Sequence, residues 1–174
     1  MKPAFAVWLT GLPSSGKSTV AAALAAQLQD RGVDVAILES DALRRIFTPH
    51  PTYSEEERDT FYNAIVHVGQ LLVDHGVPVI FDATANRRAY RDRARELIPN
   101  FLEVFIDCPL EICMQRDVKG IYRSGKAGGS TTVPGLQTVY EPPKHPDVVL
   151  SHQGESIQSA AQRIVAVLTE KRYL

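Results

Sequence analysis

The glycine-rich stretch GLPSSGKST, near the N-terminus, carries the clearest chemical signal in the sequence. Gly11 is followed after four residues by Gly16, Lys17 and Ser18, which is the spacing of the phosphate-binding P-loop. The backbone N–H groups of such a loop converge on phosphate oxygens, the lysine reaches the β and γ oxygens, and the hydroxyl can ligate Mg²⁺. The stretch therefore predicts a nucleoside triphosphate site. Its expected contacts are Gly11, Leu12, Pro13, Ser14, Ser15, Gly16, Lys17, Ser18 and Thr19.

Two acidic residues, Glu39 and Asp41, come directly after the second apolar run of the chain. Ligands of open α/β folds bind at the carboxyl edge of the sheet. A carboxylate there can accept the proton of an acceptor hydroxyl or order a metal-bound water. Ser40 and Asp41 could instead only cap the helix that follows. Arg44 and Arg45, one turn further on, suit a second anionic ligand, although arginines are also common on surfaces.

The other charged and metal-ligating residue types give weaker signals. Arg58 lies in the acidic stretch SEEERD, where it is either an ion-pair partner of the glutamates or a ligand to substrate. The five histidines show no metal spacing, so we expect them to be surface or packing residues. Cys108 and Cys113 are expected to be packing thiols rather than a disulfide or a metal pair.

Five apolar runs of strand length alternate with segments of helical period, which is the pattern of a parallel sheet covered by helices. The runs are AFAVWLT, DVAILE, VPVIFDA, FLEVFID and DVVLS. Because each run is nearly continuous, we expect all five strands to be buried on both faces. Helices are expected over 17–32, 54–76, 88–98, 109–117 and 155–173, the second of them beginning with a capping box of Ser54 and Glu57. The sequence thus predicts a three-layer α/β fold with a five-stranded parallel sheet.

Composition narrows the class of protein. A length of 174 residues suits a single domain over 1–174, and the 44% hydrophobic and 22% charged fractions are those of an ordinary globular protein. A net charge of -1 lacks the basic surplus of proteins that coat nucleic acid. The first apolar run is too short for a signal sequence, and no run approaches the roughly 18 residues of a membrane helix. We therefore expect a cytoplasmic protein with no nucleic-acid or membrane partner.

The segment from Lys119 to Pro146 differs from the rest of the chain. It is rich in Gly, Pro, Ser and Thr and has no sustained apolar period. A loop of that length within a compact domain is usually a lid or binding loop, or else it is disordered. Its basic residues, among them Arg123 and Lys126, favour a basic lid loop, which we expect over about 117–146.

From the P-loop onward, the chain resembles the adenylylsulfate kinases, which transfer the γ-phosphoryl group of ATP to the 3'-hydroxyl of adenosine 5'-phosphosulfate. The most specific stretches are RDVKGIYRSGKAGG, where the family has R-D-x-K-G-[LI]-Y and a basic lid, and YEPP before the last strand. With GLPSSGKST, SDALR and RAYRDRAR, the likeness covers nearly the whole chain. It implies a P-loop kinase fold, ATP and Mg²⁺ as cofactors, a small-molecule nucleotide substrate and, in many members, a homodimer.

The resemblance also implies roles for single residues. Lys17 and Asp41 are expected to be catalytic, and Ser18 and Asp41 to hold the metal ion. The adenine of ATP is expected to lie against Arg116 and Pro143, or a proline near it. The residues expected to bind the acceptor nucleotide are Asp41, Arg44, Tyr53, Arg58, Phe61, Lys119 and Val133. A lid that closes over both nucleotides would exclude water from the phosphoryl group.

The sequence departs from the family pattern near the acceptor. The usual D-G-D is ESD, the usual D-R-x-E-N-I-R-R is reduced to ERDTFYNA, and the usual S-x-I-S-P-Y-R is DATANRR, which is also similar to the D-x-T-N element of polynucleotide-kinase-like kinases. Val133 stands where the family has the second aromatic residue of an adenine clamp, a wall that Phe61 could rebuild. Ala85 stands where a serine is sometimes described as a phosphorylated intermediate, so we expect direct, in-line transfer.

Three functions are therefore open at this point. The first is an ATP-dependent adenylylsulfate kinase. The second is a kinase of the same fold acting on another anionic hydroxyl compound, such as a different nucleotide, which would account for the departures. The third is a nucleotide-binding subunit without catalysis, but such a module has no need of Asp41, Arg44, Arg58 and a basic lid together.

Overall fold

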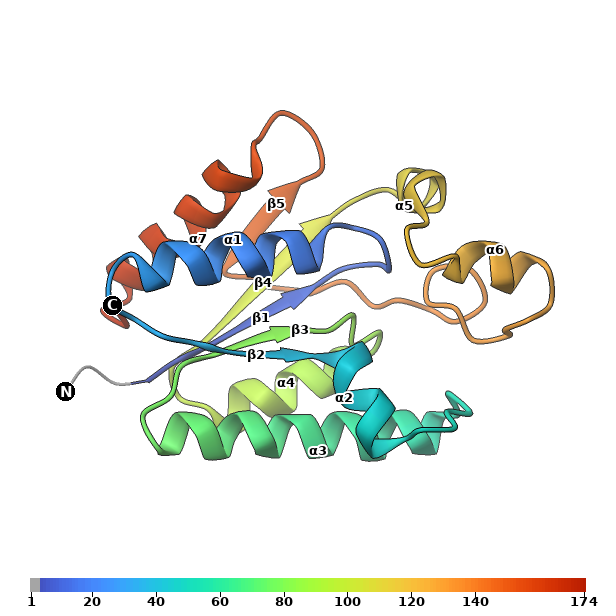
Figure 1. The fold of residues 1–174 in the computed structure, drawn as a ribbon, viewed down its shortest axis with the longest axis horizontal. Coiled ribbons are helices and arrows are strands. Elements are labelled where there is room, and N and C mark those ends of the chain that lie inside the picture. Colours follow the sequence, from blue (N-terminus) through green and yellow to red (C-terminus); the bar gives the residue numbers. More distant parts are fainter. Residues whose placement is uncertain (1–3) are drawn as a thin grey trace.

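The computed structural model describes residues 4–174, which form a five-stranded parallel sheet between two layers of helices (Figure 1). The strand order is β2-β3-β1-β4-β5. The strands are β1 (Ala6–Thr10), β2 (Ala36–Glu39), β3 (Val79–Asp82), β4 (Phe101–Asp107) and β5 (Val148–Ser151). The helices are α1 (Lys17–Gln29), α2 (Ser40–Phe47), α3 (Glu55–Asp74), α4 (Arg88–Leu97), α5 (Leu110–Arg116), α6 (Ile121–Lys126) and α7 (Ile157–Glu170). The predicted fold class is confirmed.

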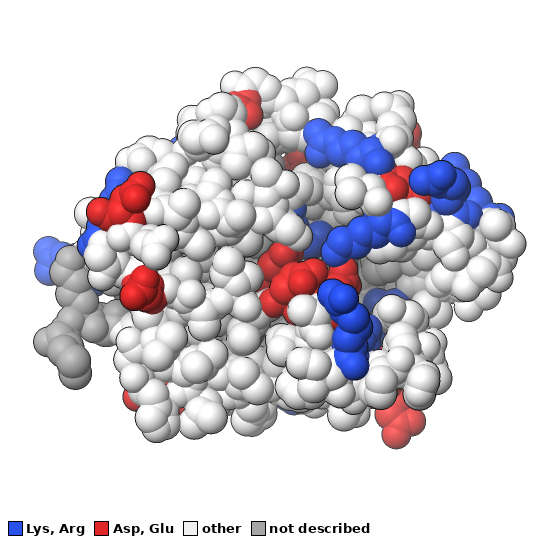
Figure 2. All heavy atoms as spheres, viewed as in Figure 1, with Lys and Arg blue, Asp and Glu red and all other residues white. Residues whose placement is uncertain are grey.

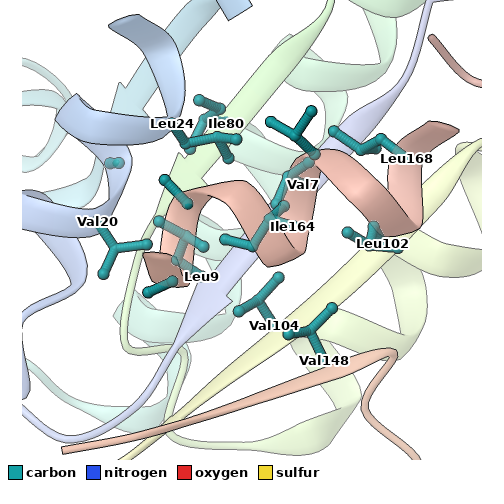
Figure 3. Close-up of a cluster of buried hydrophobic side chains, with 14 of the residues drawn as sticks. Val7, Leu9, Val20, Leu24, Ile80, Leu102, Val104, Val148, Ile164 and Leu168 are labelled. Carbon is teal, nitrogen blue, oxygen red and sulfur yellow. The ribbon is translucent and has the colours of Figure 1, made fainter. Parts of the chain in front are cut away.

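The helices divide between the two faces of the sheet and its carboxyl edge. Helices α1 and α7 cover one face, α3 and α4 cover the other, and α2, α5 and α6 lie beyond the ends of the strands (Figure 1). Under α1 and α7 the strands contribute branched aliphatic side chains to a dry cluster. Figure 3 shows its members, including Val7, Leu9, Ile80, Leu102 and Val104 from the sheet and Val20, Leu24, Ile164 and Leu168 from the helices.

Burial on both faces holds for the central strands but not for the two at the edges. Every residue of β1 and of β3 is buried. In contrast, β5 alternates between buried and exposed residues, and Ile37 of β2 is 43% exposed. An edge strand has a neighbour on one side only, and its outer part lies beyond the covering helices. The expectation of full burial was therefore wrong for β2 and β5.

The opposite face is built around aromatic side chains. Trp8 of β1 stacks on Phe81 of β3 at 4.4 Å between ring centroids, and its indole Nε1 donates a hydrogen bond to the carbonyl oxygen of Ala83 at 3.0 Å. Tyr62 of α3 accepts a hydrogen bond from the N–H of Ala85 at 3.1 Å. The core thus fixes the loop over 83–87, which follows β3 at the carboxyl edge.

Helix α3 begins with half of the predicted capping box. Ser54 Oγ accepts a hydrogen bond from the N–H of Glu57 at 3.2 Å. The Glu57 carboxylate does not return to Ser54. It accepts instead from the N–H groups of Thr52 and Tyr53, at 2.6 and 3.2 Å, and so organises the chain that leads into the helix.

The segment expected as a lid loop contains the short helix α6, which the sequence analysis did not predict. The Asp117 carboxylate caps it by accepting hydrogen bonds from the N–H groups of Tyr122 and Arg123, at 3.1 and 2.9 Å. The Tyr122 ring is buried, and its hydroxyl donates to the Pro13 carbonyl oxygen at 2.9 Å. Six residues are too few to give a periodic apolar pattern, whereas one buried tyrosine suffices to anchor them.

Two further expectations concern thiols and membrane segments. Cys108 and Cys113 are free and buried, as expected of packing thiols. Among residues 4–174, no helix combines the length and the apolar character that crossing a membrane requires.

Gly69 allows α3 to pack closely on the sheet, and this gives a stability prediction. A Cβ atom at Gly69 would lie 2.1 Å from Cζ of Phe81. We expect Gly69→Ala to lower the free energy of unfolding by about 1–3 kcal/mol, although alanine favours a helix over glycine. Urea unfolding measures the change. Leu71→Ala on the exposed side of α3 is the control, expected within about 0.5 kcal/mol of wild type. Equal losses in both variants would contradict the packing argument.

Candidate functional site

A large cleft lies at the carboxyl edge of the sheet, where the sequence places its chemistry. It has a volume of about 850 Å³, near the upper end for small-molecule sites. Its walls come from the P-loop, from the start of α2, from α5, α6 and the lid, and from the loop after β5. Figure 2 shows acidic side chains gathered beside a hollow at this edge, with lysine and arginine side chains around them.

The P-loop connects β1 to α1 and needs both glycines of its motif. Gly11 has φ +154, and a Cβ there would lie 2.7 Å from the carbonyl oxygen of Ile106 on β4. Gly16 has φ +108 and caps α1, a backbone conformation that other residues rarely adopt. Residues 13–19 line the cleft. The N-terminus of α1 therefore faces it, as an anion site requires.

Leu12, the second residue of the P-loop, is not part of the cleft lining. A Cβ on Gly135 of the lid would lie 2.6 Å from Leu12 Cδ2. Leu12 lines a separate open groove together with Phe105 and Tyr140, so its side chain supports the lid rather than the cleft.

Lys17 lies at the floor of the cleft, folded against its own loop. Its Nζ donates to the carbonyl oxygens of Gly11 and Leu12, at 3.1 and 2.9 Å. Burial lowers the pKa of Lys17 to about 8, against the opposing effect of the Asp82 and Asp41 carboxylates. An ammonium group that is poorly solvated in this way has much to gain from phosphate oxygens.

Asp82 is a site residue that the sequence analysis missed. The parallel register aligns it with Leu9 of β1 on one side and with Glu39 of β2 on the other. Its side chain is 4% exposed and lines the cleft beside Lys17. The reasoning that singled out Glu39 and Asp41, a carboxylate at the end of a buried strand, applies equally to the last residue of VIFD and could have found it.

Asp41 does not cap α2. No side chain caps that helix, and Glu39 takes the cap position. The Asp41 carboxylate accepts a hydrogen bond from Lys119, which extends from the lid side of the cleft and also lies 3.5 Å from Glu39 Oε1. Burial alone would lower the pKa of Lys119, but these two carboxylates raise it. Both side chains of the Asp41–Lys119 pair are about half exposed, so a ligand entering the cleft can displace the contact at little cost.

Arg44 is buried between two aromatic rings. Its guanidinium carbon lies 3.9 Å from the ring centroid of Phe61 and 5.0 Å from that of Tyr53, and Nη1 pairs with Glu57 at 3.1 Å. Phe61 is 1% exposed and lies outside the cleft lining. In the structure, Phe61 therefore packs against Arg44 and does not form the wall of the adenine clamp that the sequence suggested. Arg45 is exposed and donates to the Asp41 carbonyl oxygen.

Arg58 lines the cleft, and each of its three side-chain nitrogens donates one hydrogen bond within the protein. Nε donates to the Tyr53 carbonyl oxygen at 3.0 Å, Nη1 to Asn86 Oδ1 at 3.1 Å, and Nη2 to the Thr132 carbonyl oxygen at 2.7 Å. No carboxylate pairs with it among the ion pairs of residues 4–174. The reading of Arg58 as a partner of the neighbouring glutamates is therefore wrong. Two of its five N–H donors remain for a ligand.

The residues expected around the two adenine rings lie as follows. Val133 lines the cleft but is 2% exposed. Arg116 lines it from α5 and donates to the Ser15 carbonyl oxygen at 3.4 Å. Pro143 is not among the residues that line the cleft. The loop after β5, including His152, also lines the cleft.

The oxygen donors that line the cleft suit a hard divalent cation. Ser18, Asp41 and Asp82 all offer oxygen ligands, which Mg²⁺ prefers. Within the described residues there is no group of three or more His, Cys, Asp or Glu side chains that could form an all-protein metal cage. A magnesium ion held partly by substrate phosphates agrees with both facts.

Known proteins similar to this chain share both its sequence and its fold. The family model for adenylylsulphate kinase matches residues 3–151. The adenylyl-sulfate kinase of Synechococcus sp. (strain JA-3-3Ab) is 39% identical over 97% of this chain and 96% of its own length. That of Microcystis aeruginosa is 38% identical over 97% of this chain and 93% of its own.

Among solved structures, the APS kinase of Mycobacterium tuberculosis in complex with AMPPNP and APS aligns with a TM-score of 0.90 and 34% identity. The alignment covers 97% of this chain and 99% of that one. A sugar kinase from Janibacter sp., at 22% identity and a TM-score of 0.68, shares the fold alone. The P-loop, the carboxylates and the arginines of the cleft thus occur on a chain that belongs to the adenylylsulfate kinase family.

Proposed function

We propose that this chain is an ATP-dependent adenylyl-sulfate kinase, which phosphorylates the 3'-hydroxyl of adenosine 5'-phosphosulfate to give 3'-phosphoadenylylsulfate in sulfate activation. The observation that carries the proposal is that one cleft holds the P-loop, Asp41, Arg44 and Arg58 together on a chain of this family. A module that only binds nucleotides would need no second cationic subsite beside the P-loop.

The P-loop half of the cleft suits Mg²⁺-ATP. Lys17 would exchange the carbonyl oxygens of its own loop for β and γ oxygens of the triphosphate. Ser18 and Asp82 are proposed as the protein ligands of Mg²⁺, since the serine follows the P-loop lysine and the aspartate ends the neighbouring strand β3. The ion would supply charge neutralisation on the β and γ phosphates. Asp41 is kept as a further candidate ligand.

Asp41 is proposed to accept the proton of the 3'-hydroxyl. The hydroxyl oxygen attacks the γ-phosphorus, the bond from that phosphorus to the β–γ bridging oxygen breaks, and ADP leaves with the bond's electron pair. Lys119, released from Asp41, is available for the charge on the transferred group. Ala85 offers no nucleophile, which supports direct transfer.

Three other expectations stay predictions: a single domain over 1–174, a cytoplasmic location and a homodimer. Light scattering on the purified protein measures the last of these.

A steady-state assay tests the proposed function. We expect the wild type to form 3'-phosphoadenylylsulfate from ATP, Mg²⁺ and adenosine 5'-phosphosulfate, and Lys17→Ala to impair both ATP binding and turnover. If the wild type forms no product at millimolar substrate, the proposal fails. Turnover of another nucleotide in its place would favour a kinase with a different acceptor.

Asp41→Ala tests the proposed base. We expect kcat to fall about a hundredfold or more, the usual contribution of a positioned proton acceptor. Arg45→Ala is the control, because Arg45 lies on the same helix, is exposed and does not line the cleft. A near-normal kcat for Asp41→Ala would remove Asp41 from the chemistry.

The lowered pKa of Lys17 gives a pH-dependent prediction. Above pH 8 the free protein holds Lys17 mostly neutral, whereas the phosphates of ATP favour the ammonium form. Binding of ATP at pH 9 should therefore take up a proton, and binding at pH 7 should not. Calorimetry in buffers of different ionisation enthalpy measures the uptake. Lys17→Arg is the control, since arginine stays charged throughout. Equal proton uptake by Lys17→Arg would contradict the assignment to Lys17.

A further inference from the structure

Asn86 occupies a buried junction between the loop after β3, helix α3 and the lid. It is 3% exposed. Its side-chain oxygen accepts a hydrogen bond from Arg58 Nη1 at 3.1 Å, and its side-chain Nδ2 donates to the Val139 carbonyl oxygen at 3.2 Å. Its own carbonyl oxygen accepts from the N–H of Glu141 at 2.8 Å. One residue thus contacts α3 and two points of the lid, Val139 and Glu141.

The two lid contacts of Asn86 directly follow a compact turn over residues 133–138. Within that turn, the N–H of Gln137 donates to the Val133 carbonyl oxygen at 2.9 Å. The N–H of Gly135 donates to the Thr138 carbonyl oxygen at 2.8 Å. The turn begins beside Thr132, whose carbonyl oxygen is held by Arg58 at 2.7 Å. It ends at Val139, which is held by Asn86. The Arg58–Asn86 pair therefore holds both ends of the turn.

This turn forms a wall of the acceptor half of the cleft. Thr132, Val133 and Pro134 line the cleft, and so does Tyr53, whose carbonyl oxygen is bound by Arg58 Nε at 3.0 Å. The ATP half comprises the P-loop, Arg116 and the loop after β5. None of these residues is a hydrogen-bond partner of the Asn86 side chain, whose partners are Arg58 and Val139. A change at Asn86 should consequently act on one half of the cleft.

The loop that carries Asn86 is itself rigidly held. The Arg91 side chain is buried, pairs with Glu103 at 2.8 Å and donates to the Ala85 carbonyl oxygen. Trp8 and Tyr62 hold Ala83 and Ala85 from the core. Asn86 therefore projects from a fixed support, which is what a residue needs in order to position others.

We propose that Asn86 is a positioning residue for the acceptor nucleotide. It orients the Arg58 guanidinium and fixes the lid turn over 133–138, so that Arg58, Tyr53 and Val133 present a preformed acceptor subsite. The inference rests on the proposed function, because it concerns the acceptor subsite of that reaction.

Asn86→Ala separates this role from a merely structural one. We expect the KM for adenosine 5'-phosphosulfate to rise about tenfold, the usual effect of losing a hydrogen bond to a charged group, while the KM for ATP changes less than about twofold. Hydrogen exchange of the lid amides over 133–141 should become faster. Asn100→Ala is the matched control, because Asn100 also donates one side-chain hydrogen bond to a carbonyl, that of Ala4, but lies before β4 at the far end of the sheet. It should leave both KM values and lid exchange unchanged.

Two further variants keep the test decisive. Asn86→Asp retains an acceptor for Arg58 but cannot donate to Val139, so it should still speed exchange in the lid even if Asn86→Ala fails to fold. Combined with Arg58→Lys, Asn86→Ala should raise the KM by a smaller factor than it does alone, because part of its effect acts through the contact with Arg58. Equal rises in both KM values, unchanged lid exchange or fully additive effects would overturn the proposal. If the wild type makes no product, the proposed function fails, and lid exchange in the variants still decides whether Asn86 positions the turn.

Discussion

The register between the parallel strands β2, β3 and β1 is the constraint on which the rest of the site depends. It sets Glu39 beside Asp82 and Asp82 beside Leu9, one residue before the end of β1. Since Gly11 then begins the P-loop, the carboxylates and the phosphate-binding backbone lie in one row at one edge. A shift of one residue in any of these pairings would turn the carboxylates to the opposite face of the sheet.

Three buried cationic side chains also lie at this edge of the sheet, and each has a different set of partners. Lys17 binds only carbonyl oxygens, Arg44 has one carboxylate and two aromatic rings, and Arg58 has two carbonyls and an amide. Positive charge that is buried without full neutralisation is costly to the fold. That free-energy cost is reduced when anions enter the cleft. The groups that destabilise the free protein therefore favour the binding of phosphates and sulfate.

The fold was largely predictable, because its signals are local. Continuous apolar runs mark the strands, Ser54 marks the start of α3, and Gly32 marks the end of α1 to within three residues. Two local expectations failed for reasons that are not local. The exposure of Ile37 and Val149 depends on which strands lie at the edges, and α6 depends on a tyrosine that is buried against Pro13 more than a hundred residues earlier in the chain.

The sequence by itself determined the phosphate site and the family, because the P-loop spacing and the RDVKGIY and YEPP stretches are contiguous in the chain. It also placed Asp41, Arg44 and Arg58 near an acceptor. Only the tertiary structure decided how these side chains are used. It brought Asp82 beside Lys17, left Phe61 and Pro143 outside the lining of the cleft, and joined Arg58 through Asn86 to the lid. Contacts between residues 28 to 74 positions apart depend on how the layers pack, and no short pattern in the sequence encodes that packing.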